Sequence, residues 1–336
     1  MEKTRRQQRK YVDFFPLHML LNIKEIMEGC KAGTQKKVLS IGLVCLDIIK
    51  VVSDFPREDT DQRCLDCLWR RGGNASNSAS VLSLLGASSE FLGSFSAGPY
   101  LQFLQSDFKE YGISITHCPI YTETDSPVSV VIVNRKSGSR TILHTNKNLR
   151  ELCFEDFKKI NVKDAYYSWI HFEGRSNVSE IKKMLLYLRE HNDASNESNH
   201  ITTSLEVEKP ERYSELRGLM DLADYIFVSK EVAQSLGYCE MKLAVNELVE
   251  NCRQGGTVIC PWGDCGAAAK RKCGTLIISP AFPPEEVIDT LGAGDTFIGA
   301  AVFALNQGEN LQESVKFACK VAGAKCGIMG NQGLRE

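Results

Sequence analysis

The sequence predicts an α/β fold in which a doubly wound, mostly parallel sheet is flanked by helices and carries a small β-sheet lid. Short apolar segments alternate with segments of helical periodicity along most of the chain, the pattern of a parallel sheet covered by helices. Two segments, about 48–71 and 118–145, break this alternation with exposed-strand patterns. A glycine-rich turn near the C-terminus leads into a helix pattern. These three observations define the expected fold.

The elements can be placed in chain order from their patterns. The first part is expected to contain a buried strand at 38–46, a helix entered through Gly72-Gly73 and running through Leu85, a strand at 91–95, a helix at 100–111 and a hairpin of 128–133 with 140–144. The second part is expected to contain strands at 169–172, 201–206, 225–228 and 257–260, helices such as 180–190 and 241–252, and a surface loop at 191–200.

The two exceptional segments, about 48–71 and 118–145, are interpreted as the lid. Ligands bind beyond the strand ends of open α/β sheets, and a β lid inserted there would cover them. These segments carry too few apolar residues to form a sheet that the main domain alone protects. Their open face and edges are therefore expected to pair with the same lid of a second subunit, as a homodimer.

Composition narrows the class of protein. The chain has 336 residues, 43% of them hydrophobic, with a net charge of −2, so it can bury a large core and does not resemble a dedicated nucleic-acid binder. Thirteen cysteines are scattered without the spacing of a disulfide framework or a zinc site. A reducing, cytoplasmic location is expected.

The N-terminal segment 1–36 differs from the alternating strand and helix pattern of 37–334. It has a basic head and an apolar run at 14–23 that is too short to span a bilayer. It lacks the features of a signal peptide, and its acidic residues disfavour a transit peptide. We expect a poorly ordered extension that carries no chemistry and no membrane anchor.

The stretch Asp289-Thr-Leu-Gly-Ala-Gly-Asp295 is typical of a phosphoryl-transfer site. Gly292, Ala293 and Gly294 let backbone N–H groups approach an anion, and the following helix start adds its free amides and positive dipole end. Asp295 lies in the first helical turn, beside the place where charge develops, as a proton acceptor. The alternative is an ordinary capped connection between a strand and a helix.

A second polar group precedes the first long helix, in Arg71-Gly-Gly-Asn74-Ala-Ser-Asn77. Asn74 and Asn77 are one turn apart, and their amides offer the donors and acceptors that sugar hydroxyls need. The alternative is that Asn74 caps the helix and Asn77 is solvated. Asp47, expected at the end of the first strand, could accept from two hydroxyls or belong to a turn. No GxxxxGK[ST] phosphate loop occurs.

These two motifs together resemble the signatures of the ribokinase-like carbohydrate kinase family. Further similar stretches narrow the resemblance to members that phosphorylate fructose at its C1 hydroxyl, and it covers about 37–334. Those stretches include Leu46-Asp47, Arg63-Cys-Leu65, 171–175, 206–210 and 281–284. The resemblance implies that ATP and D-fructose give fructose 1-phosphate and ADP.

The resemblance also implies residue roles. Asp295 would take the proton from the sugar, the segment Gly292, Ala293 and Gly294 would form the anion hole, and Arg140 would neutralise phosphate charge as the lid closes. The sugar would be held by Asp47, Gly73, Asn74 and Asn77, together with Asp59 from the lid of the other subunit. ATP would lie near Ser229, Trp262, Asp264, Gly266, Phe282 and Cys326, with Mg²⁺ on its phosphates. A potassium ion would lie beside Asp289.

Other functions remain open at this point. The anion loop is shared by other sugar and nucleoside kinases, and a catalytically silent sugar sensor could have the same fold. Loss of Asp295 or the glycine pair would indicate a silent module, and all three residues are present. A dinucleotide-dependent oxidoreductase is disfavoured because Gly42-Leu-Val lacks the GxGxxG turn.

Overall fold

The structure is a computed structural model that describes residues 36–137, 139–162, 166–328 and 330. The N-terminal extension expected at 1–36 lies outside the described residues except for Lys36.

The main sheet has eight strands in the order β14-β13-β12-β11-β10-β9-β1-β4 within the described residues. Neighbours from β12 to β4 pair in parallel, and only β13 and β14 run antiparallel. The strands are β1 Lys37–Ile41, β4 Ser89–Leu92, β9 Tyr167–Glu173, β10 Thr202–Val207, β11 Tyr225–Val228, β12 Thr257–Pro261, β13 Ala267–Arg271 and β14 Leu276–Ser279. The prediction of a mostly parallel, doubly wound sheet is confirmed.

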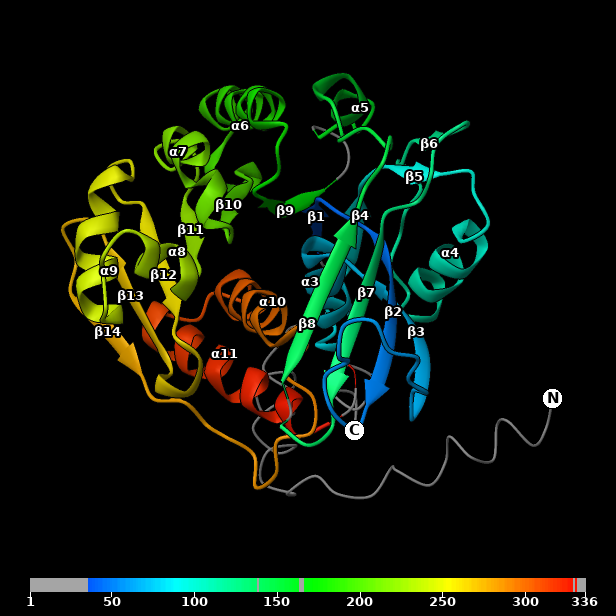
Figure 1. Cartoon of the computed structure of the whole chain (residues 1–336). Helices are drawn as coiled ribbons and strands as arrows, with labels where there is room; N and C mark the ends of the chain where they lie inside the picture. Colours follow the sequence, from blue (N-terminus) through cyan, green and yellow to red (C-terminus); the bar gives the residue numbers. More distant parts are fainter. Residues whose placement is uncertain (1–35, 138, 163–165, 329, 331–336) are drawn as a thin grey trace.

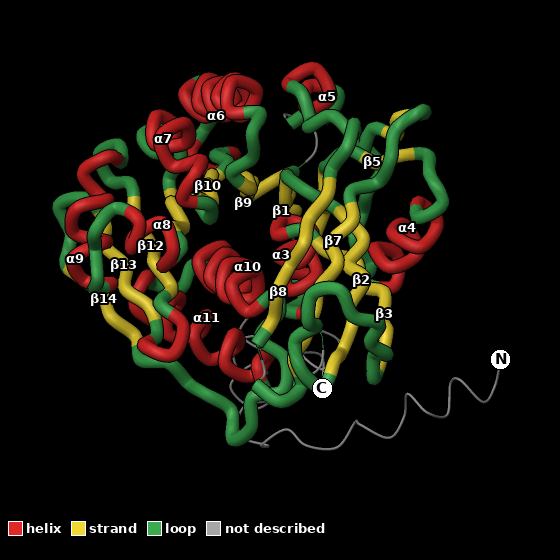
Figure 2. Tube along the Cα trace, in the orientation of Figure 1, coloured by secondary structure: helices red, strands yellow, loops and turns green. Residues whose placement is uncertain are grey.

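Helices cover both faces of this sheet (Figures 1 and 2). The apolar residues of α3, α10 and α11 pack in one core, and those of α5 to α9 pack in another. The helices are α3 Asn74–Leu84, α4 Leu101–Glu110, α5 Phe154–Lys158, α6 Val178–Asp193, α7 Tyr213–Leu216, α8 Lys230–Ser235, α9 Met241–Leu248, α10 Ala293–Asn306 and α11 Leu311–Cys326. Short 3₁₀ turns lie at Glu197–Asn199, Pro210–Arg212, Arg217–Leu219, Val249–Asn251 and Gly263–Cys265. The predicted loop 191–200 is thus partly helical, and the helix predicted at 241–252 ends in a 3₁₀ turn.

A four-stranded sheet, which we call the lid sheet, stands beside α3 and α10 (Figure 1). Its strands, in the order β3-β2-β7-β8, are β3 Asp66–Gly72, β2 Cys45–Val52, β7 Val128–Asn134 and β8 Arg140–Thr145. The central pair β2–β7 is parallel, and both outer pairs are antiparallel. The two sequence segments assigned to the lid therefore form one sheet. The short strand β6 Ile120–Tyr121 belongs elsewhere, because it pairs with β5 Phe95–Ser96.

The prediction of one continuous strand at 38–46 is wrong. Strand β1 ends at Ile41 in the main sheet, and β2 begins at Cys45 in the lid sheet. The chain turns at Gly42, where a Cβ atom would lie 2.5 Å from the Glu173 carboxylate and 2.8 Å from the Ala75 side chain. The run is apolar throughout because each half is buried, although in a different sheet.

No described helix combines the length and apolar character that crossing a membrane requires.

Candidate active site

The residue directly before helix α3 stands at a position that only glycine can occupy. Gly73 precedes the helix with φ 101°, and a Cβ atom there would lie 2.1 Å from the carbonyl oxygen of Leu43. This backbone conformation is costly for any other residue. The helix has no side-chain cap, so the hypothesis that Asn74 caps it is wrong. Gly73 instead directs the first turn of α3 toward the ends of β9 and β10.

Asn77 connects this first turn to Asp295 of α10. Its amide nitrogen donates to Asp295 Oδ2 at 2.7 Å, so the half-buried Asn77 is paired within the protein. Asp295 is 8% exposed, and burial raises its pKa to about 7 despite the Asn77 hydrogen bond, with Glu208, Glu173 and Asp47 adding to the increase. A carboxyl group with a pKa near neutrality is well matched to general-base work.

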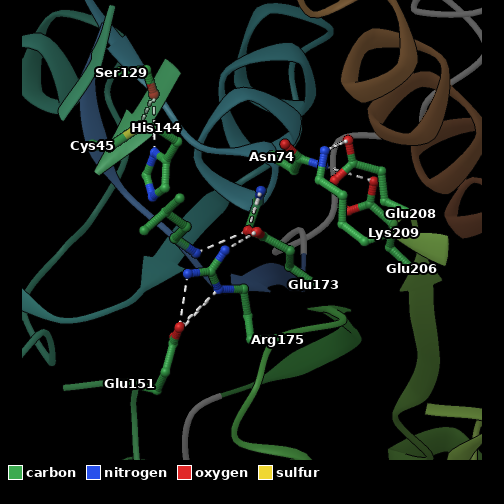
Figure 3. Close-up of polar contacts among 12 residues, drawn as sticks. Cys45, Asn74, Ser129, His144, Glu151, Glu173, Arg175, Glu206, Glu208 and Lys209 are labelled. Carbon is green, nitrogen blue, oxygen red and sulfur yellow. Dashed lines mark hydrogen bonds and ion pairs between the residues drawn. The ribbon is translucent and has the colours of Figure 1, made fainter. Parts of the chain in front are cut away.

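Asn74 is held in the same way by a different carboxyl group. Its amide nitrogen donates to Glu206 Oε1 at 3.0 Å (Figure 3). Glu206 is buried near the end of β10, directly beside Glu173 of β9 in the register of the two strands. The structure thus brings both asparagines to carboxyl groups that lie at the carboxyl ends of strands or at the start of α10.

Glu173 is a site residue to which sequence reasoning gave no role. Its Oε2 accepts from the backbone N–H groups of Leu43 at 2.8 Å and Ala75 at 3.1 Å. Arg175 bonds to Glu173 at 3.2 Å and to Glu151 at 2.7 Å (Figure 3). The available signal was a glutamate at the carboxyl end of a strand, where Glu206 also lies in β10, at the sheet edge where ligands bind.

Asp47 lies within β2 instead of at a strand end, because the strand starts at Cys45. It is 9% exposed and accepts from Cys45 Sγ at 3.4 Å. Burial raises the pKa of Asp47 above its usual value. Gly72 on the paired strand leaves it room, since a Cβ atom there would come within 2.3 Å of both carboxylate oxygens. On β7, the other strand paired with β2, the Ser129 hydroxyl lies 3.1 Å from His144 Nδ1 (Figure 3).

The predicted anion loop forms the start of α10. Gly292 precedes the helix with φ 78°, and no side chain caps it, so the alternative of an ordinary capped connection is not what forms. Gly294 is exposed, and Ala293 donates its N–H to the carbonyl oxygen of Thr290 at 3.2 Å. A helix start of this kind attracts anions through its free amides and dipole. Arg140 of the lid strand β8 donates to the Thr290 hydroxyl, so this lid cation reaches the loop.

Asp289, nominated as the potassium ligand, is engaged by two cations. Its Oδ2 lies 2.9 Å from Arg70 of the lid strand β3 and 3.2 Å from Lys325 of α11, and it accepts from the Gly330 N–H at 3.0 Å. Burial alone would raise the pKa of Asp289, but Lys325, Arg70 and Gly330 together lower it to about 2. Because two cationic side chains already neutralise Asp289, its carboxylate does not fit a potassium site. Within the described ranges, no group of three or more His, Cys, Asp or Glu residues is arranged to hold a metal ion.

Two of the predicted nucleotide residues connect to the site through the backbone. Ser229 caps α8 by accepting from the Val232 N–H, and its hydroxyl donates to the carbonyl oxygen of Glu208 at 2.7 Å. The Cys326 carbonyl accepts from the N–H groups of Ile288 at 2.8 Å and Asp289 at 3.1 Å. The end of α11 is therefore attached to the segment that leads into the anion loop.

The other predicted nucleotide residues lie around the turn between β12 and β13 and near α11. Trp262 is buried, with Lys230 Nζ 5.8 Å from its ring centroid, whereas Asp264 is exposed. Gly266 has φ 92°, and a Cβ atom there would lie 2.1 Å from the Ser279 carbonyl oxygen. Phe282 packs its backbone so closely on α11 that a Cβ atom at Gly323 would lie 1.9 Å from its carbonyl oxygen.

Asp59, predicted to reach the pocket of a second subunit, lies in the connection between β2 and β3. It is exposed and has φ 59°. Within one subunit, no described polar contact joins it to the pocket residues.

A buried carboxyl group with a pKa near neutrality beside an uncapped helix start is an arrangement suited to phosphoryl transfer to a hydroxyl. Comparison with known proteins identifies the family of enzymes. The model of the pfkB family carbohydrate kinases matches residues 35–334, and the chain belongs to that family. It is a sugar kinase, and family membership implies that it uses ATP and Mg²⁺.

Individual relatives support this family assignment. The chain is 44% identical to mouse ketohexokinase over 300 residues, which cover 89% of this chain and 99% of the mouse protein. It is 21% identical to ribokinase of Bacillus subtilis, covering 89% and 95% of the two chains. Among solved structures, a putative ribokinase from Agrobacterium tumefaciens matches with a TM-score of 0.74 at 20% identity, covering 89% and 94%. The ribokinase-like fold is confirmed.

Proposed function

We propose that the chain phosphorylates D-fructose at its C1 hydroxyl, with ATP as donor, to give fructose 1-phosphate and ADP. The observation that carries the proposal is the buried Asp295 carboxyl, held by Asn77 at 2.7 Å at the open start of α10. The likeness to mouse ketohexokinase over almost its whole length supports the choice of sugar.

In this mechanism Asp295 accepts the proton of the attacking hydroxyl. The helix start at Gly292, Ala293 and Gly294 stabilises the charge that develops on the transferring group, and Arg140 adds a cation from the lid. Mg²⁺, when bound, would neutralise phosphate charge. Because the described residues offer no dedicated carboxylate cluster, we expect ATP phosphates to supply most of its ligands.

The sugar is placed between the lid sheet and the first turn of α3. Asp47 offers carboxylate oxygens, while Asn74 and Asn77 offer amide oxygens, since each amide nitrogen is turned toward a carboxyl group of the protein. Gly73 leaves room for the sugar beside the backbone. We propose that ATP lies along Ser229, Trp262, Asp264, Gly266, Phe282 and Cys326.

The lid supports the proposal of a homodimer. Trp69 of β3 and Leu143 of β8 are 50% and 58% exposed, and the register of the lid sheet places both on the same face. Such apolar exposure on one sheet marks an interaction surface. In the proposed dimer, Asp59 of one subunit contacts the sugar bound to the other.

A subunit-mixing experiment tests the shared site. Subunits carrying Asp295→Asn are expected to be nearly inactive and subunits carrying Asp59→Ala to use fructose poorly, and exchange between them should restore one intact site in some dimers. Light scattering would give the mass of the active species. An active monomer, or a mixture that recovers no activity, would contradict this arrangement.

The chief alternative is a kinase for another sugar or a nucleoside, since the chain is also 22% identical to adenosine kinase of Schizosaccharomyces pombe. An assay of ADP release with fructose, ribose, adenosine and glucose separates these functions. Turnover with none of them would favour a silent sugar sensor. A cytoplasmic location stays a prediction from the scattered cysteines. A potassium ion near Asp289 also stays a prediction. The ion pairs of Asp289 with Arg70 and Lys325 argue against it.

A further inference from the structure

Three carboxyl groups from three elements hold the first turn of α3. Glu173 of β9 accepts from the Ala75 N–H, Asp295 of α10 accepts from the Asn77 amide, and Glu206 of β10 accepts from the Asn74 amide. The first fixes the backbone and the second is the proposed base. Glu206 has neither role, so its contact with Asn74 requires a separate account.

Glu206 is placed where an ionised carboxylate is unfavourable. It is 5% exposed, and Glu173 is its neighbour across the parallel pair β9–β10. Burial first, and then the nearby Glu208, Asp295 and Glu173, hold the pKa of Glu206 well above its usual range. Its Oε1 accepts from Asn74, whereas its Oε2 has no hydrogen-bond partner among the described residues. A neutral carboxyl group at this place costs less than a buried charge.

The hydrogen bond to Glu206 determines which way the Asn74 amide faces. An asparagine amide carries two donors on nitrogen and an acceptor on oxygen, and rotation by half a turn exchanges them. Because the nitrogen is turned to Glu206 (Figure 3), the oxygen faces away from β10. On the side away from β10 the Asn74 oxygen is an acceptor, so the group that contacts this oxygen must be a hydroxyl that donates its proton.

We propose that Glu206 is a positioning residue that sets sugar specificity through Asn74, an inference that rests on the proposed function. It keeps the Asn74 oxygen toward the sugar, so that the pocket selects a substrate with a proton-donating hydroxyl at one ring position. Without Glu206 the amide turns freely and can offer its nitrogen instead. The pocket then accepts a group that cannot donate.

Two substitutions at the same position separate orientation from charge. Glu206→Leu removes the acceptor for the Asn74 amide, and we expect the KM for fructose to rise about 10-fold because the amide loses the partner that fixes its orientation. The KM for ATP should not change. Glu206→Gln keeps an acceptor for Asn74 and has a donor in place of the second oxygen, so it should retain nearly the KM of the unmodified enzyme.

Fluorinated sugars test which group the Asn74 oxygen recognises. Deoxyfluoro analogues of fructose, altered at C3 or at C4, keep an acceptor of similar size but cannot donate a proton. We expect the unmodified enzyme to discriminate against one analogue by about 10-fold, and Glu206→Leu to lose most of that discrimination. A matched control is Glu90→Gln, since Glu90 is equally buried but pairs with Lys37 at 3.2 Å. It should lower the melting temperature without altering discrimination.

Defined results would overturn the inference. These are an unchanged KM in Glu206→Leu, equal damage from Gln and Leu, or undiminished discrimination between fructose and its analogues in Glu206→Leu. Absence of fructose turnover by the unmodified enzyme would instead refute the proposed substrate. The same two variants would then be compared on whichever sugar that enzyme phosphorylates or, by calorimetry, binds, with the same outcomes supporting or overturning the role of Glu206.

Discussion

The starts of α3 and α10 resemble each other locally and differ in what occupies them. Each helix follows a glycine with positive φ, Gly73 at 101° and Gly292 at 78°, and neither has a side-chain cap. At α3 the protein supplies its own anion, since Glu173 accepts from the Ala75 N–H. At α10 the adjacent Gly294 is exposed. An uncapped helix start after a glycine thus stabilises the fold at α3 and leaves an anion site available at α10.

The largest expected effect concerns the base at the open helix. Asp295→Asn keeps the shape and the contact with Asn77 but cannot accept a proton, so kcat should fall about 10²–10⁴-fold. Fructose binding, measured by calorimetry, should persist. A variant with nearly unchanged kcat would show that α10 does not carry the base.

The two glycines should respond differently to the same substitution. Gly73→Ala forces a positive φ and a 2.1 Å contact with the Leu43 carbonyl oxygen, so we expect a loss of about 3 kcal/mol or more in the free energy of unfolding. The new side chain of Gly292→Ala would lie 3.8 Å from its nearest neighbours, on Asn77 and Asp295, and should cost only about 1–2 kcal/mol. Denaturant unfolding of both variants measures the difference. Equal losses would contradict the comparison.

Removal of the internal anion at α3 should have a smaller effect on stability. Glu173→Ala leaves two backbone N–H groups without their acceptor and removes one of the two carboxylates that pair with Arg175, and we expect a loss of about 2 kcal/mol in the free energy of unfolding. Thermal or denaturant melting checks this. Glu151→Ala, which removes only the other partner of Arg175, is the matched control and should cost less.

The smallest effect is a pH dependence that arises at the open helix. Because burial raises the pKa of Asp295 to about 7, kcat/KM should fall as pH drops below about 7, by about tenfold per pH unit, as the base becomes protonated. Stability should show the opposite sign. Between the usual carboxyl pKa and about 7 the folded state binds more protons than the unfolded state, so this group's contribution declines as pH rises. In Asp295→Asn that decline should be reduced, and an identical melting profile would argue against the assigned pKa.

The sequence predicted those parts of the fold whose signals are contiguous. The anion loop lies within 289–295, and the strands near 169–172, 201–206, 225–228 and 257–260 are short runs rich in β-branched, aromatic or apolar residues, so all of them could be located. The run at 38–46 was misread because apolar composition records burial and not the sheet in which a residue is buried. Gly42 marks the break, but the reason lies in its distant neighbour Glu173.

The candidate site was predictable only in part, for a related reason. Asn74 and Asn77 could be placed on one helix because their spacing is local. Their partners Glu206 and Asp295 are separated from them by 132 and 218 residues, and only the assembled sheet brings them together. The capping hypothesis for Asn74 was locally reasonable, and it failed because Gly73 occupies that position.

The parallel pairing of β2 with β7 has a consequence for synthesis of the chain. Strands β2 and β3 emerge first as a hairpin, while β7, the other neighbour of β2 in the lid sheet, lies at Val128–Asn134, after α3 and α4. Until β7 is made, one edge of β2, with the buried residues Leu46 and Ile49, lacks its partner. Unpaired apolar edges promote association between nascent chains. We therefore expect this hairpin to be the segment of the emerging chain that most needs a chaperone.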